Sequence, residues 1–397
     1  MRDPMTSAER RAGVSLAAIF ALRMLGLFLI LPVFAEHART IPGGDDLTLV
    51  GLAIGAYGLT QACLQIAYGA ASDRYGRKPV ILFGLLLFVI GSAVAALAHD
   101  MHMIIVGRVL QGAGAISAAV TALAADLTRD QHRTKVMAMI GSSIGLVFAL
   151  SMVAAPLLHA AIGMSGIFWL TALLALLAMG LVIWVVPLAP PVPRANGGRF
   201  IDVLRDAQLM RLNLGVFALH LIQTTMWVMV PSALTRSGLP MASHWQVYLP
   251  AVLVSFVVMV PAVIVAERRN RMKPVFNAAV ALLALVQFGL YLHGEGLMML
   301  ASMLTLFFIA FNVLEATQPS WISRIAPPHA KGTALGVYNT LQSIGLFLGG
   351  LIGGWLGQHH GPQAVSLFCA VLALAWLALA LTMKPPPLRI VSPADKG

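Results

Sequence analysis

Four ionisable residues interrupt long apolar stretches of the 397-residue sequence: Arg23, Arg108, His220 and Glu315. An ionisable side chain in apolar surroundings is costly unless it is paired or hydrated, so each of the four is a candidate for binding or transferring charge. The alternative for each is a permanently hydrogen-bonded packing residue. The residues around each of the four decide between a functional role and a packing role.

Glu315 is the leading candidate for proton exchange, because it is the only carboxylate that we place well inside an apolar stretch. A carboxyl group in such surroundings is suited to proton exchange. The alternative is a carboxylate that is permanently paired with Asn312 or Gln318. His220 titrates near neutral pH and could sense or relay protons, or it could be a satisfied packing histidine.

The two arginines are candidates for binding charged groups. Arg23 lies roughly ten residues into its apolar stretch, or roughly 15 Å deep at about 1.5 Å per helical residue. Arg108 with Gln111 could bind an anionic group or repel a proton from a neighbouring acid, and the alternative is a hydrogen bond between buried helices. Trp227 could line an apolar cavity, although aromatic residues in such segments usually pack. The predicted proton and substrate candidates are Arg23, Arg108, Gln111, His220, Trp227, Asn312 and Glu315.

The elements that must position these residues are transmembrane helices. The sequence is 59% hydrophobic and only 10% charged. A helix needs about 20 apolar residues to cross roughly 30 Å of hydrocarbon, so we predict an all-α membrane protein. The twelve predicted transmembrane helices lie near residues 13–35, 49–71, 79–98, 102–125, 136–159, 164–187, 211–235, 246–266, 274–293, 297–322, 332–357 and 362–383.

The basic residues predict the orientation in the membrane. The net charge is +11, and most of the 26 Lys and Arg residues fall in the terminal segments and in the alternate loops on their side. Cytoplasmic loops carry the excess of basic residues in membrane proteins, so we expect both termini to be cytoplasmic. The basic composition then reflects topology and indicates no nucleic-acid partner.

The sequence divides into two similar halves. A polar segment rich in Pro and Gly, 188–210, is the predicted cytoplasmic linker between a six-helix bundle in 1–187 and another in 211–397. At an offset of about 195 to 198 residues, Arg23 aligns with His220. Two parallel repeats of this kind predict a solute-binding site near the middle of the membrane.

The loop between the second and third predicted spans carries the most specific motif. Residues 69–79 read Gly-Ala-Ala-Ser-Asp-Arg-Tyr-Gly-Arg-Lys-Pro, which resembles the signature loop of the major facilitator superfamily. Residues 107–114 resemble the motif of its proton-linked members, and residues 23–26 and 126–129 resemble the YajR-type branch of the drug:proton antiporters. The resemblance covers the whole chain and implies the major facilitator fold of two pseudo-symmetric six-helix bundles.

The signature loop predicts a conformational latch. Asp73 could pair with Arg77 and with the positive N-terminus of the eleventh span, and Asp126 could be a second acceptor for Arg77. Gly69 would let two helices approach closely. The charges would pair in one conformation and separate in the other, stabilising an outward-open state, unless they only enforce topology. The predicted latch residues are Gly69, Asp73, Arg74, Gly76, Arg77, Lys78, Asp126 and Arg133.

The resemblance implies a secondary active transporter that works by alternating access as a monomer, and not an enzyme. The leading hypothesis is a proton-coupled efflux antiporter for small amphipathic or drug-like solutes in a bacterial inner membrane. The alternative is a proton symporter that imports a sugar or an organic acid. Protons, a small-molecule substrate and the lipid bilayer are the expected partners. The sequence contains no G-x-x-x-x-G-K-[ST] phosphate loop and no metal-ligand spacing, so we predict no cofactor and no metal.

Overall fold

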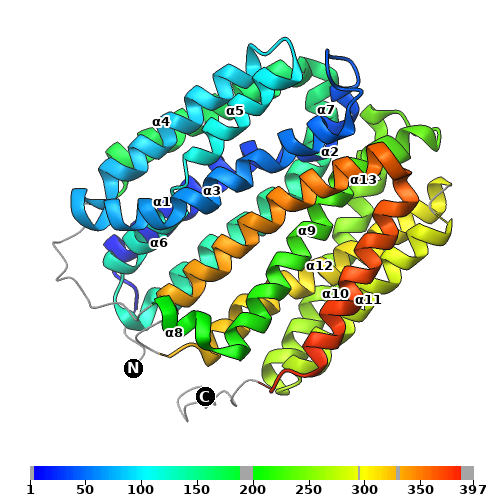
Figure 1. Cartoon of the computed structure of the whole chain (residues 1–397). Coiled ribbons are helices and arrows are strands. Elements are labelled where there is room, and N and C mark those ends of the chain that lie inside the picture. The colour runs from blue at the N-terminus through cyan, green and yellow to red at the C-terminus, as the bar shows by residue number, and fades with distance from the viewer. Residues whose placement is uncertain (1–3, 188–199, 294–295, 328–330, 386–397) are drawn as a thin grey trace. The chain divides into compact units, whose positions relative to one another are not determined.

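The protein is helical throughout the part of the chain that the computed structural model describes, which comprises residues 4–187, 200–293, 296–327 and 331–385 (Figure 1). No strand occurs within these ranges. The larger part of the predicted linker 188–210 lies outside them. The helices are α1 (Ser7–Phe28), α2 (Leu31–Ala38), α3 (Leu47–Tyr75), α4 (Arg77–Ala96), α5 (Met101–Ala113), α6 (Ser117–Asp126), α7 (Asp130–Gly180), the π-helical turn η1 (Leu181–Val185), α8 (Phe200–Arg205), α9 (Ala207–Arg236), the 3-10 turn η2 (Met241–Ser243), α10 (Trp245–Arg268), α11 (Met272–His293), α12 (Leu297–Ile325) and α13 (Lys331–Leu381).

Ten helical segments among the described residues are long and apolar enough to cross a membrane, and two of these contain two spans each. Both α7 and α13 are 51 residues long and contain a glycine with positive φ, Gly163 (φ 66°) and Gly361 (φ 78°). An α-helix cannot continue through that backbone conformation, so each glycine is a corner between two helices. Both corners lie where the sequence predicts a break between two spans. Dividing α7 and α13 at these corners turns the ten segments into the twelve predicted spans. The all-α membrane fold is confirmed.

Two of the predicted spans are interrupted, which corrects the sequence prediction of continuous helices. The first, 13–35, is split into α1 and α2, because Pro32 in the first turn of α2 has no amide hydrogen to extend the preceding helix. The fourth, 102–125, is split into α5 and α6 at Gly114 (φ −78°, ψ 46°). A Cβ at Gly114 would lie 2.4 Å from the carbonyl oxygen of Gly84, so α4 approaches closely where the helix breaks.

The described chain forms two compact units. The first comprises Met1–Asn196, Gln223–Gln246 and Leu346–His359, and the second comprises Gly197–Ile222, Val247–Gly345 and His360–Gly397. Helices α9 and α13 therefore contribute residues to both units. The division into bundles 1–187 and 211–397 stays a prediction.

Close backbone contacts hold the helices of the first unit together. Helix α1 packs against α7, and α4 packs against α5 (Figure 1). A Cβ at Gly91 of α4 would lie 2.6 Å from the carbonyl oxygen of Gly107, and a Cβ at Gly112 of α5 would lie 2.2 Å from that of Tyr57 in α3. Small residues thus let α5 touch both neighbours, which brings polar side chains on α5 within reach of the α3 backbone.

The end of the first unit where α3 begins is closed by contacts with α13. We call this the opposite end, and we call the end where α3 meets α4 the basic end. A Cβ at Gly51 would lie 2.0 Å from the carbonyl oxygen of Gly350, and a Cβ at Gly354 would lie 2.2 Å from that of Leu47. The amide of Leu47 also donates to Gln358 Oε1 at 2.9 Å. At the opposite end, α3 and residues 346–359 of α13 are therefore in direct backbone contact.

Aromatic side chains fill the second unit between its helices. Helix α11 packs against α12. The ring of Phe276 lies 5.2 Å from that of Trp321 and 5.9 Å from that of Trp376, both in edge-on geometry. A Cβ at Gly215 of α9 would lie 2.8 Å from Trp376 Nε1, so this glycine admits the indole. This core supports α9 and α12, which carry His220 and Glu315.

Candidate functional site

Arg77 is the centre of a polar network at the basic end of the first unit. It is the first residue of α4 and follows Gly76, whose φ of 97° turns the chain out of α3. Its Nε donates to Asp126 Oδ2 at 2.9 Å and its Nη1 donates to Ser72 Oγ at 2.8 Å and pairs with Asp73. The side chain of Asp126 is 14% exposed and that of Asp73 is 57% exposed. Arg77 is thus bound to one half-buried carboxylate and one that is open to solvent.

The other predicted latch residues lie around this network without joining it. The guanidinium of Arg74 stacks over the Tyr75 ring at 5.3 Å, and Lys78 Nζ donates to the carbonyl oxygen of Val186 at 2.6 Å. A Cβ at Gly69 would meet its nearest neighbour at 3.9 Å, which is ordinary contact. Among the described residues the close helix approach that we expected at Gly69 does not occur, and α3 makes its close contacts with α13 at Gly51 and Gly55. The side chain of Arg133 lies outside the described residues.

The second unit contains a related network at the corresponding helix ends. Glu267 and Ser320 stand at the same offset from Asp73 and Asp126 along the chain. Ser320 Oγ donates to Glu267 Oε1 at 2.5 Å, and Arg324 pairs with the other oxygen of Glu267. The repeat that the sequence indicates is therefore matched by contacts, but an acid occupies the centre here and a base occupies it in the first unit.

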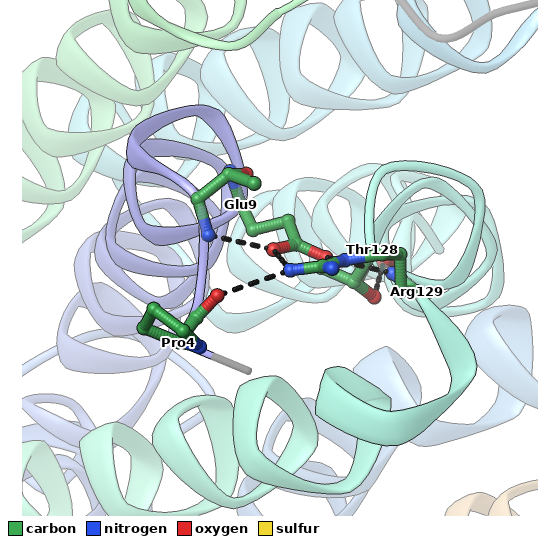
Figure 2. Close-up of polar contacts among 6 residues, drawn as sticks. Pro4, Glu9, Thr128 and Arg129 are labelled. Atoms are coloured by element: carbon green, nitrogen blue, oxygen red, sulfur yellow. Dashed lines mark hydrogen bonds and ion pairs between the residues drawn. The ribbon is translucent and has the colours of Figure 1, made fainter. Parts of the chain in front are cut away.

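A further ion pair fastens the start of α1 to the turn between α6 and α7 (Figure 2). The carboxylate of Glu9 is only 4% exposed. It accepts hydrogen bonds from Arg129 Nε at 2.8 Å, Arg129 Nη2 at 2.9 Å and the Arg129 amide at 3.1 Å. Arg129 Nη2 also donates to the carbonyl oxygen of Pro4 at 3.1 Å. This contact holds the turn that directly follows Asp126.

Arg23 lies in the interior of the first unit among neutral groups. Its Nη2 donates to Tyr57 Oη, to Gln61 Oε1 at 3.3 Å and to the carbonyl oxygen of Gly114 at 3.3 Å. Its Nη1 donates to Ser117 Oγ at 3.3 Å. The carbonyl of Gly114 is accessible because α5 ends there, so the break in the fourth span supplies one of the acceptors.

Arg108 is buried beside the same Tyr57 ring, with its guanidinium carbon 5.3 Å from the ring centre. Its Nη1 donates to Gln111 Oε1 at 2.7 Å, and its Nε and Nη2 donate to the backbone carbonyls of Ala53 and Ile54 at 3.2 and 3.4 Å. Gln111 Nε2 in turn donates to Ser92 Oγ at 2.8 Å. The predicted pair of Arg108 and Gln111 is therefore in contact, and it joins α3, α4 and α5.

His220 and Glu315 lie together in the second unit. His220 Nε2 is 3.4 Å from Glu315 Oε1, and the two side chains are 5% and 33% exposed. His220 Nδ1 must donate to the carbonyl oxygen of Val216 at 3.0 Å, so in the neutral imidazole Nε2 is an acceptor, here for Gln342 Nε2 at 2.7 Å. The carboxylate thus faces a nitrogen that becomes a donor only when His220 takes up a proton.

The remaining candidates are not part of that pair. Asn312 Nδ2 donates to Ser255 Oγ at 2.8 Å, and Gln318 accepts from Tyr338 Oη at 3.4 Å. Glu315 is therefore paired with neither Asn312 nor Gln318, which was the alternative to a proton-exchange role. Trp227 is buried on α9 in the first unit.

Several contacting residues were missed by the sequence reasoning. Tyr57 and Gln61 are spaced one turn apart in an apolar span, and that spacing could have marked them as partners for a buried cation. Thr6 and Glu9 form an N-terminal capping box, which is a recognisable motif, but the long-range bond of Glu9 to Arg129 leaves no local signal. Among the described residues no group of three or more His, Cys, Asp or Glu side chains could hold a metal ion.

Comparisons with known proteins give the family. The model of the Major Facilitator Superfamily matches residues 16–350 and 215–397. The inner membrane transport protein YajR of Escherichia coli is 45% identical over 98% of this chain and 88% of its own length. The multidrug resistance protein MdtH of Yersinia enterocolitica is 27% identical over 84% of each chain.

A solved structure agrees with this assignment at the level of the fold. The structure of a D-xylose–proton symporter, 14% identical, matches with a TM-score of 0.76 over 94% of this chain and 98% of that chain. The protein is a multi-pass membrane transporter and not an enzyme. With a family match over most of its length and a relative at this level of identity, the chain belongs to the major facilitator superfamily.

Proposed function

We propose that the protein is a proton-coupled efflux antiporter for small amphipathic or drug-like solutes. It works as a monomer by alternating access in a bacterial inner membrane, with both termini in the cytoplasm. The distribution of basic residues supports the orientation. The similarity to YajR, an inner membrane protein, supports the location, and the more distant similarity to MdtH supports efflux.

The observation that carries the proposal is the contact between His220 and Glu315. Glu315 is partly exposed, its Oε1 has no hydrogen bond, and it lies on α12 within an apolar span. An ionisable pair inside a span is costly, so it is a candidate for function, and a carboxylate beside a histidine can pass a proton between two groups. Glu315 is therefore the proposed proton carrier.

His220 determines where the proton moves within this pair. When Nε2 is unprotonated it accepts from Gln342, and when it is protonated it donates toward Glu315 Oε1. Proton uptake therefore exchanges a neutral contact with α13 for an ion pair with α12. A coupling proton could change helix packing in this way.

The Arg77 network is the proposed latch. Its contacts with Asp73 and Asp126 are made in a structure whose opposite end is packed. We therefore propose that the contact that changes during transport involves Asp73, whose side chain is 57% exposed and has room for another partner. Asp126, the more buried acid, keeps Arg77 in place throughout.

Proton coupling is tested in proteoliposomes with an imposed pH gradient. Lumenal pH is recorded while lipophilic cations, weak acids and sugars are added in turn, first with the native chain and then with Glu315→Gln. We expect solute-dependent proton release that falls to the level of empty liposomes in Glu315→Gln. Asp45→Asn, which removes an exposed carboxylate before α3, is the matched control and should transport normally.

The outcomes separate the alternatives. Proton movement in the same direction as a sugar or an organic acid would identify a symporter. Solute transport without any proton movement would remove proton coupling from the proposal. Unchanged proton release in Glu315→Gln would assign the carrier role to another group.

A further inference from the structure

Arg23 is an incompletely satisfied cation. Its side chain is 1% exposed, yet Nε has no hydrogen-bond partner among the described residues. A guanidinium has five N–H donors, and three of the four bonds that Arg23 makes are 3.3 Å long and end on neutral oxygens. At that length these hydrogen bonds are weak. A stronger acceptor would replace them readily.

Positive charge accumulates around Tyr57 without a counter-charge. The guanidinium carbons of Arg23 and Arg108 lie 5.8 and 5.3 Å from the centre of the Tyr57 ring. No carboxylate in the described part of the chain pairs with either arginine. Each of the three guanidinium nitrogens of Arg108 makes a hydrogen bond, so Arg23 is the one of the two with a nitrogen that has no partner among the described residues.

We propose that Arg23 binds the negatively charged group of the solute, so that the transported molecule is an apolar body carrying a carboxylate or sulfonate. This inference rests on the proposed transport function and names its substrate class. The oxygens of the anion take the places of Gln61 Oε1 and Ser117 Oγ. Gln61 and Ser117 are both partly exposed, so these two partners of Arg23 are accessible from the surface.

The guanidinium suits an anion in both geometry and charge. Nε and the neighbouring Nη form the planar fork that a carboxylate accepts with two parallel bonds, and Nε is the donor without a partner. The nearby charge of Arg108 adds to the attraction in a medium of low dielectric constant. The same two charges repel a lipophilic cation, so the site discriminates by charge and not by shape.

The test compares two probes with the same apolar body and opposite charge, 2-naphthoate and (2-naphthylmethyl)trimethylammonium. Equilibrium binding of each radiolabelled probe is measured with the purified full chain in detergent. We expect tighter binding of naphthoate. Gln61→Glu places a carboxylate where it pairs with Arg23. Naphthoate then loses its charge-assisted bonds to the guanidinium, so its binding should weaken about tenfold to hundredfold.

Two further variants make the result specific. Gln363→Glu is the matched control, because it makes the same substitution at an exposed site on α13, and naphthoate binding should be unchanged. Arg23→Lys keeps the charge without the fork, so naphthoate should remain preferred over the cation with reduced affinity. A thermal melt of each variant shows that it is folded.

Equal binding of the two probes, absence of binding, or naphthoate binding unaffected by Gln61→Glu would each overturn the proposal. Equilibrium binding requires no proton gradient, so a failure of proton coupling leaves the anion result standing. Conversely, a cation that is preferred and exchanged for protons would preserve the proposed function and exclude the anion site.

Discussion

The contact between α3 and α13 at the opposite end predicts that Gly51→Ala changes the conformational equilibrium. A Cβ at Gly51 would lie 2.0 Å from the carbonyl oxygen of Gly350, whereas ordinary contact begins at 3.4 Å. The obstacle is backbone and cannot rotate away. The two helices must therefore separate by more than an ångström before the methyl group fits.

The size of the effect follows from the cost of overpacking. Inserting a methyl group into a packed contact typically costs about 1–3 kcal/mol. This cost applies only to the conformation in which the opposite end is packed, so the equilibrium should shift about 5- to 150-fold toward the conformation in which these helix ends are apart. The gain in helix propensity from Gly to Ala is common to both conformations and cancels.

Spin-label distances measure this shift directly. Cysteines introduced at the exposed positions Asp45 and His359 report the separation of the two helix ends in a background that lacks Cys63 and Cys369. In Gly51→Ala the long-distance population should increase. Gly145→Ala is the matched control, since a Cβ there meets nothing within 4 Å, and its distance distribution should equal that of the parent. An unchanged distribution in Gly51→Ala would refute the assignment of the α3–α13 contact as a barrier to opening.

Three more substitutions test the networks at the basic end. Asp73→Asn should change the rate at which a cysteine next to the Arg77 loop reacts with a water-soluble maleimide, because the exposed acid is the proposed changing contact. Asp126→Asn should lower the thermal midpoint, because it removes the negative charge of the less exposed partner of Arg77. Glu9→Gln should also lower the thermal midpoint, because three hydrogen bonds from Arg129 lose the charge of their acceptor, and it should leave solute binding unchanged.

One control variant serves all three substitutions. Asp45→Asn removes an exposed carboxylate at the other end of the first unit and should alter neither accessibility nor thermal midpoint. An accessibility pattern that stays the same in Asp73→Asn would end the latch proposal. A thermal midpoint in Glu9→Gln equal to that of the native chain would show that the Arg129 contact contributes nothing to stability.

The membrane class and the number of spans could be predicted because they depend on local sequence. Twenty apolar residues are long enough to span a bilayer whatever they pack against. The corners at Gly163 and Gly361 were predicted as breaks for the same reason, since the apolar run is too long for one crossing. The interruption at Gly114 was not predicted, because it depends on the approach of α4, which is a contact between distant segments.

The site was predicted in its ionisable residues and not in their partners. Arg23, Arg108 and Glu315 stand out because charge is rare in apolar sequence. Their neighbours Tyr57 and Gln342 are ordinary residues whose role appears only when helices far apart in the sequence come together. The packed opposite end could not be predicted either, since a transporter must keep two conformations close in free energy and its sequence is compatible with both.

The glycine corners also limit how this protein can be engineered. At Gly163 and Gly361 one helix gives way to the next without an intervening loop, and both corners occur at the same place in the repeat. An epitope tag or protease site inserted there would have no slack chain to absorb it and would push two membrane helices apart. The turn at residues 39–46 connects α2 to α3 outside any helix, and its exposed residues Arg39 and Thr40 are the better position for a topology reporter.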